Sequence, residues 1–357
     1  MLHGSVDDMR VVFLIEDSLP NGRVGPELTP TLWSLIEEGG WHPDGGVSVL
    51  ASSTYPNHAS FATGTDVAAH RIFTNEVWNG ESFVCSSTIG PVGDTIFDAA
   101  RRAGISTSAT LGDKTMIGVM GARRADVSWP PDGALPNGTP LDCLGYAANA
   151  AVLEVLGSTD ALDVDLSYVH FNDPDSMLHV FGPGAPETTR RIRQIDDDLA
   201  SVVELLRPRW DETVLFVVSD HEQEEVDDTA EPIDLAALLH HAGFPGQSHN
   251  EGTIGIVYEG PGASEIARLE DIAGATDLDD GVTLAWSDPG RVFGTRPTEL
   301  RGQHGSPRTR SQVATVSGGH PRVPELGRLL AGARPHATDW APLVASLFTF
   351  SLGDEHR

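Results

Sequence analysis

At three places in this sequence of 357 residues, aspartate follows a buried apolar run. Asp17, Asp175 and the pair Asp220-His221 each stand just beyond such a run. The carboxyl ends of parallel strands meet at one edge of an open α/β sheet, where ligands bind. Carboxylates gathered there repel one another unless a cation lies between them. A single aspartate at a strand end is ordinarily a turn former, so it is the set that predicts a metal site.

Histidines at specific spacings complete a plausible ligand set. In Asp175-Ser-Met-Leu-His179 the two end residues share one face if a helical turn begins at Asp175. His304 lies in Gly302-Gln303-His304-Gly305, where flanking glycines allow close approach of a ligand. Imidazole and carboxylate together form a zinc-type donor set, which manganese and iron also accept.

The elements that position these residues alternate between apolar runs and helical patterns, which predicts a mostly parallel sheet covered by helices. We expect one α/β domain over residues 1–357, with lid or loop segments at about 112–160 and 223–300. The predicted strands are 11–15, 47–51, 105–111, 166–171, 213–219, 254–258 and 283–286. The predicted helices are 30–38, 56–63, 95–103, 188–206, 233–241, 323–333 and 341–348.

The charge balance excludes several classes of partner. The formal net charge is -29, and Lys114 is the only lysine. Such a field repels nucleic acid and anionic membrane surfaces, so we expect neither as a partner. The polar N-terminus carries no secretory signal pattern and no long apolar run is present, so we expect a cytoplasmic protein.

Six short motifs resemble the alkaline phosphatase superfamily, most closely its nucleotide pyrophosphatase/phosphodiesterase branch and the related phosphonoacetate hydrolase. They occur in the superfamily's order and span most of the chain. The motifs are Asp17-Ser-Leu, Thr54-Tyr-Pro-Asn57-His58, Ala69-His70-Arg-Ile72 with Asn75, Asp175-x-x-x-His179, Ser219-Asp220-His221 and Gly302-x-His304-Gly305. The resemblance implies a three-layer α/β/α sandwich with a mostly parallel central sheet and a small inserted lid.

The resemblance also implies roles for individual residues. Thr54 resembles the family's nucleophile, and Asn75 its donor to a phosphoryl oxygen. Two Zn²⁺ ions are implied, one held by Asp17, Thr54, Asp220 and His221, the other by Asp175, His179 and His304. The chain departs from the family pattern at Ser18 and Glu222, where glycine is usual. Neither is a ligand, but Glu222 could narrow the site.

The predicted chemistry begins from the weakness of a threonine hydroxyl as a nucleophile at neutral pH. Zinc lowers the pKa of bound water from about 15.7 to about 7, and coordination would activate Thr54 in the same way. Thr54 also precedes a predicted helix from Pro56, whose N-terminus favours an anion. Attack on phosphorus would form a covalent phospho-threonine, which water then hydrolyses.

Lys114 is a further candidate for substrate binding. It follows a predicted strand in Leu111-Gly-Asp-Lys114. This segment resembles a Lys-Asp-Lys stretch of phosphonoacetate hydrolase, whose lysines bind the substrate carboxylate. In this sequence Gly112 stands in place of the first of those lysines. A solvated loop lysine is the alternative interpretation.

The sequence therefore predicts a hydrolase of phosphodiesters or nucleotide pyrophosphates. One alternative is a phosphonate hydrolase that cleaves a carbon–phosphorus bond. Another is a binding protein with a vestigial metal site, which would bind about one metal ion or none. The expected partner is a small anionic phosphoester, nucleotide or phosphonate; the preferred leaving group and the oligomeric state stay open.

Overall fold

The structure is a computed structural model that describes residues 9–295 and 300–353. Its centre is a seven-stranded sheet, and five neighbouring strands of that sheet are parallel. The strand order is β2 (Gly40–Trp41), β17 (Ala314–Ser317), β9 (Thr213–Val218), β1 (Arg10–Glu16), β8 (Leu166–Phe171), β6 (Thr107–Leu111) and β7 (Val127–Trp129). β17 is antiparallel to both β9 and β2.

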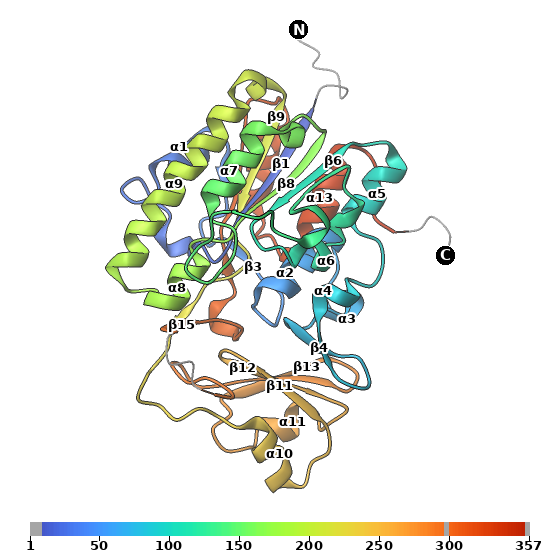
Figure 1. Ribbon diagram of the computed structural model, residues 1–357, viewed down its shortest axis with the longest axis vertical. Helices are drawn as coiled ribbons and strands as arrows, with labels where there is room; N and C mark the ends of the chain where they lie inside the picture. Colours follow the sequence, from blue (N-terminus) through green and yellow to red (C-terminus); the bar gives the residue numbers. More distant parts are fainter. Residues whose placement is uncertain (1–8, 296–299, 354–357) are drawn as a thin grey trace.

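The side chains of β1 alternate between two cores because a strand has a period of two. Phe13 packs in one core against α2 (Thr54–Thr63), α5 (Ile96–Ala103), α12 (Val323–Gly332) and α13 (Trp340–Leu347). Leu14 packs in the other core against α1 (Pro30–Glu38), α7 (Asn149–Ser158) and α9 (Pro186–Leu206). Helices therefore cover both faces of the sheet (Figure 1), which confirms the predicted mixed α/β fold with a mostly parallel sheet.

A small lobe projects below the central sheet (Figure 1) and contains a four-stranded antiparallel sheet. Its order is β11 (Gln247–Glu251), β12 (Ile254–Tyr258), β14 (Val282–Trp286) and β13 (Gly274–Asp279). One face packs on α10 (Leu235–Ala242) and α11 (Ala263–Ile266). The other face joins the main core, where Tyr258 contacts the rings of Phe73 and Phe83.

The remaining segments are short and connect the larger elements. The helices are α3 (Val67–His70), α4 (Ser86–Ile89), α6 (Met116–Val119) and α8 (Asp175–Phe181). The strands pair as β3 (Gly46–Val47) with β16 (Ser311–Gln312), β4 (Glu76–Trp78) with β5 (Phe83–Cys85), and β10 (Glu224–Glu225) with β15 (Gly302–Gln303). Among the described residues, no helix is long and apolar enough to cross a bilayer.

Most of the predicted element boundaries differ from the structure by one or two residues, and two of the differences lie next to Thr54. The strand predicted over 47–51 ends at Val47, and side chains satisfy some of the backbone groups that follow it. Asn57 Oδ1 accepts from Val49 N, and the Arg310 guanidinium donates to the carbonyl of Ser48. The helix predicted from Pro56 begins at Thr54 instead, so that Thr54 lies in the first turn.

The segments expected as lids differ from each other. Within 112–160, β7 joins the edge of the central sheet and α7 packs against α9. Within 223–300, the described residues contain the whole four-stranded sheet of the small lobe. We propose that residues 1–357 form a single domain and that the small lobe is an insertion in it.

Candidate active site

The site lies at the carboxyl ends of three adjacent strands. β1 pairs in parallel with β8 on one side and with β9 on the other. Asp17 follows β1, Asp220 lies two residues beyond β9, and Asp175 begins α8 after β8. Parallel pairing of these strands therefore brings the three carboxylates to one edge, and each of these aspartates is at most 6% exposed.

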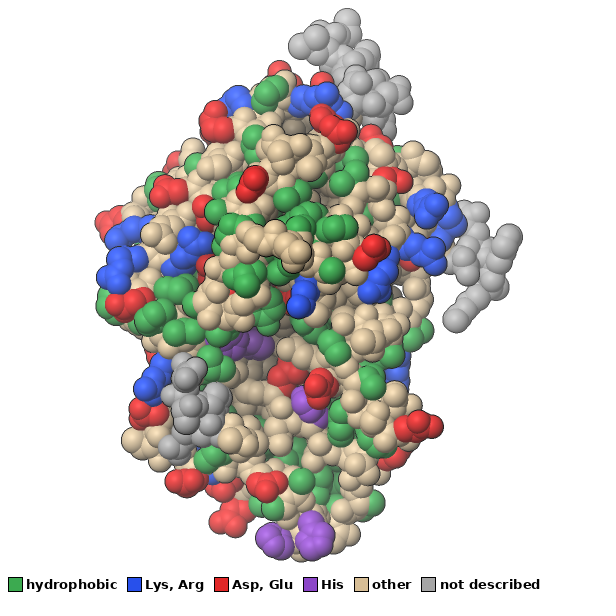
Figure 2. All heavy atoms as spheres, viewed as in Figure 1, with side chains coloured by type: hydrophobic (Ala, Val, Ile, Leu, Met, Phe, Trp, Pro, Cys, Tyr) green, Lys and Arg blue, Asp and Glu red, His purple; other side chains and the backbone are tan. Residues whose placement is uncertain are grey.

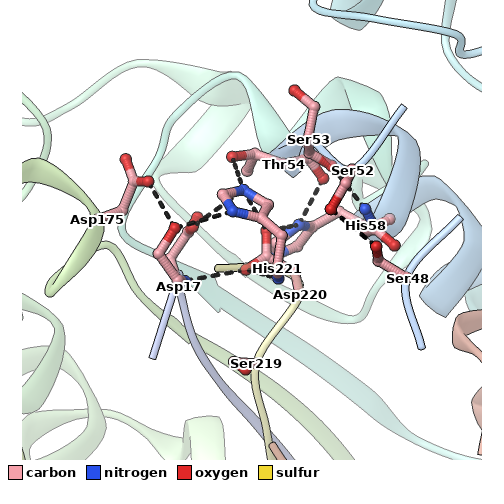
Figure 3. A network of polar contacts seen from close by, with 12 residues as sticks. Asp17, Ser48, Ser52, Ser53, Thr54, His58, Asp175, Ser219, Asp220 and His221 are labelled. Carbon is pink, nitrogen blue, oxygen red and sulfur yellow. Dashed lines mark hydrogen bonds and ion pairs between the residues drawn. The ribbon is translucent and has the colours of Figure 1, made fainter. Parts of the chain in front are cut away.

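The first set of side chains surrounds His221 (Figure 3). Its Nε2 lies 3.3 Å from Asp220 Oδ2, 3.8 Å from Asp17 Oδ1 and 3.1 Å from Thr54 Oγ1. Asp17, Asp220 and His221 thus form one buried group that could hold a metal ion. The structure brings Thr54 to the same group.

The second set adjoins the first through His221. Asp175, His221 and His304 form another buried group suited to a metal ion. His179 Nε2 lies 3.5 Å from Asp175 Oδ2, while its Nδ1 lies 2.9 Å from the carbonyl oxygen of Gly302. The ring of His304 lies 5.0 Å from that of His179 and 4.1 Å from that of His221. All seven residues predicted as ligands therefore converge.

The electrostatics of the site demand a positive charge. Burial raises the pKa of the Asp17 carboxyl well above its ordinary value, and repulsion from Asp220 and Asp175 raises it further. Asp17 Oδ1, Asp220 Oδ2 and His304 Nδ1 are buried without a hydrogen-bond partner. Burial also lowers the pKa of His304 well below its usual range, which favours the neutral ring that binds metals. Neutral imidazoles and unpartnered carboxylate oxygens are the donors that zinc takes, so the residues fit metal ions.

Two further buried histidines lie next to Asp17 and Asp220. His170 Nε2 lies 3.0 Å from Asp17 Oδ2, and His58 Nδ1 lies 3.5 Å from Asp220 Oδ2. Burial lowers the pKa of both rings. The neutral His170 ring pairs with Asp17 Oδ2 and leaves Asp17 Oδ1 unpartnered, an arrangement typical of the outer partners of metal ligands. His58 follows Thr54 by one helical turn, and its Nδ1 lies 2.8 Å from the Thr54 carbonyl oxygen.

The two departures from the family pattern have different consequences. Ser18 has a φ of 60°, the left-handed region in which glycine is most at ease. Its Oγ donates to Asp175 Oδ1 at 2.8 Å and lies 2.9 Å from His221 Nδ1. The Glu222 carboxylate is held by the backbone N–H of Asn21, from which it accepts at 3.0 Å.

The structure places the two substrate-binding candidates differently. Asn75 N donates to Glu251 Oε2 at 2.8 Å, and Glu251 Oε1 accepts from Ser53 Oγ at 2.5 Å, beside Thr54. Lys114 is exposed in the loop after β6. Its neighbour Asp113 is buried and accepts from the Tyr55 hydroxyl at 3.0 Å.

Sequence reasoning missed Glu251 altogether. No motif or charge pattern singles it out, and its two partners lie 176 and 198 positions away along the chain. Ser18 was noted only as a departure from the family. Its contacts with Asp175 and His221 depend on a positive φ angle, which no local sequence pattern predicts.

The model of the type I phosphodiesterase / nucleotide pyrophosphatase family matches residues 11–313, and the chain belongs to this family. Human ectonucleotide pyrophosphatase/phosphodiesterase family member 5 is 25% identical over 201 residues, which are 51% of this chain and 38% of that protein. Bovine bis(5'-adenosyl)-triphosphatase ENPP4 is 23% identical over 184 residues, covering 49% and 39% respectively. The chain thus matches about two fifths of each curated relative's length.

Solved structures with the same fold cover nearly the whole chain. The human ectonucleotide pyrophosphatase/phosphodiesterase 5 structure has a TM-score of 0.71 at 16% identity and covers 97% of this chain and 96% of that one. An inactive variant of the murine protein, in complex with AMP, has a TM-score of 0.69 at 16% identity with the same coverage. These similarities show the fold.

Asp17→Asn tests whether the site requires cations. Because the folded pKa of Asp17 is raised, its contribution to the stability of the metal-free protein is present below the unfolded pKa and is lost as pH rises through the folded pKa. At pH 8 in a chelator the neutral amide should therefore raise the melting temperature by a few degrees. With zinc added, the same variant should melt below the wild type, because it has lost a ligand. An equal loss of melting temperature in both conditions would contradict the interpretation.

Proposed function

We propose that this protein is a metal-dependent hydrolase that cleaves phosphodiester or nucleotide pyrophosphate bonds with Thr54 as its nucleophile. The observation that carries the proposal is the 3.1 Å approach of Thr54 Oγ1 to His221 Nε2, beside three buried carboxylates. Family membership supports the same reaction class. A relative named as a bis(5'-adenosyl)-triphosphatase and the AMP held by the murine structure are consistent with a nucleotide substrate.

We assign the metal ligands as two sets. Asp17, Thr54, Asp220 and His221 would hold one ion, and Asp175, His179 and His304 the other. Zinc is the proposed ion, and manganese or iron would accept the same donors. When bound, the ions supply Lewis acidity, which lowers the pKa of a hydroxyl and offsets phosphoryl charge.

The position of Thr54 suits an in-line attack on phosphorus. It occupies the first turn of α2, where backbone N–H groups lack helical partners and the dipole favours negative charge. Its oxygen forms a bond to phosphorus as the bond to the leaving oxygen breaks, which leaves a phospho-threonine. Water then attacks the phosphorus, releases the phosphorylated product and restores the Thr54 hydroxyl.

Asn75 is proposed to donate its side-chain N–H to a phosphoryl oxygen. Its Oδ1 is buried without a partner, and its backbone is held by Glu251. Glu251 also accepts from Ser53 Oγ, so this carboxylate links the backbone of Asn75 to the residue that precedes Thr54.

Thr54→Ala tests the role of the nucleophile. We expect kcat to fall by about 10³-fold or more on bis-p-nitrophenyl phosphate and on a nucleotide p-nitrophenyl ester, because the covalent route is removed. Thr88→Ala, which changes an exposed threonine, should retain wild-type rates. Phosphonoacetate as the fastest wild-type substrate would favour the carbon–phosphorus hydrolase, and an unchanged kcat in Thr54→Ala would remove the proposed nucleophile.

Lys114→Ala tests the proposed role of the single lysine in binding an additional anionic group of the substrate. We expect KM for a nucleoside triphosphate, which carries anionic phosphates besides the one that is attacked, to rise about tenfold, the usual scale for a lost hydrogen bond to a charged group. Bis-p-nitrophenyl phosphate has no such group, and its KM should not change. Lys114→Arg keeps the charge and should lie close to the wild type. Unchanged kcat/KM of Lys114→Ala on every active substrate would exclude Lys114 from the site.

A further inference from the structure

The turn between β11 and β12 carries one carboxylate from the small lobe into the site. Glu251, the last residue of β11, uses both of its oxygens there. Oε1 accepts from Ser53 Oγ, directly before the proposed nucleophile, and Oε2 accepts from the backbone N–H of Asn75. Glu251 therefore links Ser53, next to the proposed nucleophile, to Asn75, the proposed phosphoryl-oxygen donor.

The same turn is fixed by contacts with the segment that carries His304. The backbone N–H and the hydroxyl of Thr253 donate to the carbonyl oxygen of His304 at 3.2 Å and 2.9 Å. Gly252 has a φ of 59°, and a Cβ there would lie 2.9 Å from the backbone carbonyl oxygen of His304. The backbone thus approaches too closely for a side chain. Glu251 is consequently held in a defined position relative to the proposed ligand His304.

The hydrogen bonds of Glu251 suit its ionised form. Asn75 N can only donate, and the Ser53 hydroxyl can donate as well, so each carboxylate oxygen has a donor. Burial raises the pKa of the Glu251 carboxyl, while these two donors act in the opposite direction. A carboxylate in this position adds a negative charge next to the bound phosphoryl group.

We propose that Glu251 sets the charge of the substrate that the site accepts, favouring phosphodiesters over phosphomonoesters. This inference rests on the proposed function. A phosphodiester carries one negative charge on the group that Thr54 would attack, whereas a phosphomonoester carries close to two at pH 8 because its second pKa is about 6. The additional charge is repelled by the Glu251 carboxylate, which is hydrogen-bonded to the residue directly before Thr54, at an effective dielectric constant of about 20.

Glu251→Gln is the direct test, because an amide is close to a carboxylate in shape and can keep both partners. Its oxygen can accept from Asn75 N, and its NH₂ group can donate to Ser53 Oγ. The measured quantity is the ratio of kcat/KM for bis-p-nitrophenyl phosphate to that for p-nitrophenyl phosphate at pH 8. We expect this ratio to fall about tenfold in the variant, with inorganic phosphate binding about tenfold more tightly by calorimetry.

Two control variants separate charge from position. Glu76→Gln removes a carboxylate at the same lobe interface, where Glu76 lies 3.5 Å from His249, and should leave the ratio unchanged. Glu251→Asp keeps the charge on a shorter side chain. A charge effect therefore spares the ratio in Asp and changes it in Gln, whereas a purely positional effect does the reverse. Melting temperatures of all variants verify that they fold.

The outcomes distinguish this inference from the function on which it rests. A wild type that hydrolyses neither ester removes the proposed function, and phosphate binding still reports on the charge effect. An active wild type with an unchanged ratio and unchanged phosphate affinity in Glu251→Gln overturns the inference and leaves the hydrolase intact. An active wild type with both shifts supports the two together.

Discussion

The repulsion among Asp17, Asp175 and Asp220 is the constraint on which the site depends. Parallel pairing of β1 with β8 and β9 delivers all three to one edge, and the core on both sides of β1 prevents them from moving apart. Burial of three facing carboxylates is unfavourable without a compensating positive charge. The fold therefore holds three buried carboxylates at one edge of the sheet, and the surrounding histidines offer further donors to the metal ions that we propose.

The small lobe also contributes to the site, through the turn between β11 and β12. Its four-stranded sheet packs into the main core through Tyr258, and its β11–β12 turn reaches Ser53, Asn75 and the carbonyl of His304. Figure 2 shows the surface hollowed between the large body and this lobe, with acidic and histidine side chains beside the hollow. The lobe thus borders the residues around Thr54, while the strand ends carry the candidate metal ligands.

Local patterns predicted much of the fold, because long apolar runs and amphipathic helices are encoded over a few residues. The strands 166–171 and 254–258 and the helix 30–38 agree with the structure residue for residue. The strand predicted over 47–51 ends at Val47 in the structure. Two side chains, one of them the distant Arg310, hydrogen-bond to the backbone that follows. The candidate metal ligands could also be identified from the sequence, because they lie in short motifs. Glu251 could not, because its partners Ser53 and Asn75 are far from it in sequence and only the tertiary fold brings them together.

Anomalous X-ray diffraction from crystals of the zinc-loaded protein tests the central claim most directly. The account predicts two peaks at the zinc edge in each chain. One should lie among Asp17, Thr54, Asp220 and His221, and the other among Asp175, His179 and His304. A crystal of well-folded protein with zinc elsewhere, or with no zinc at this edge of the sheet, would contradict it.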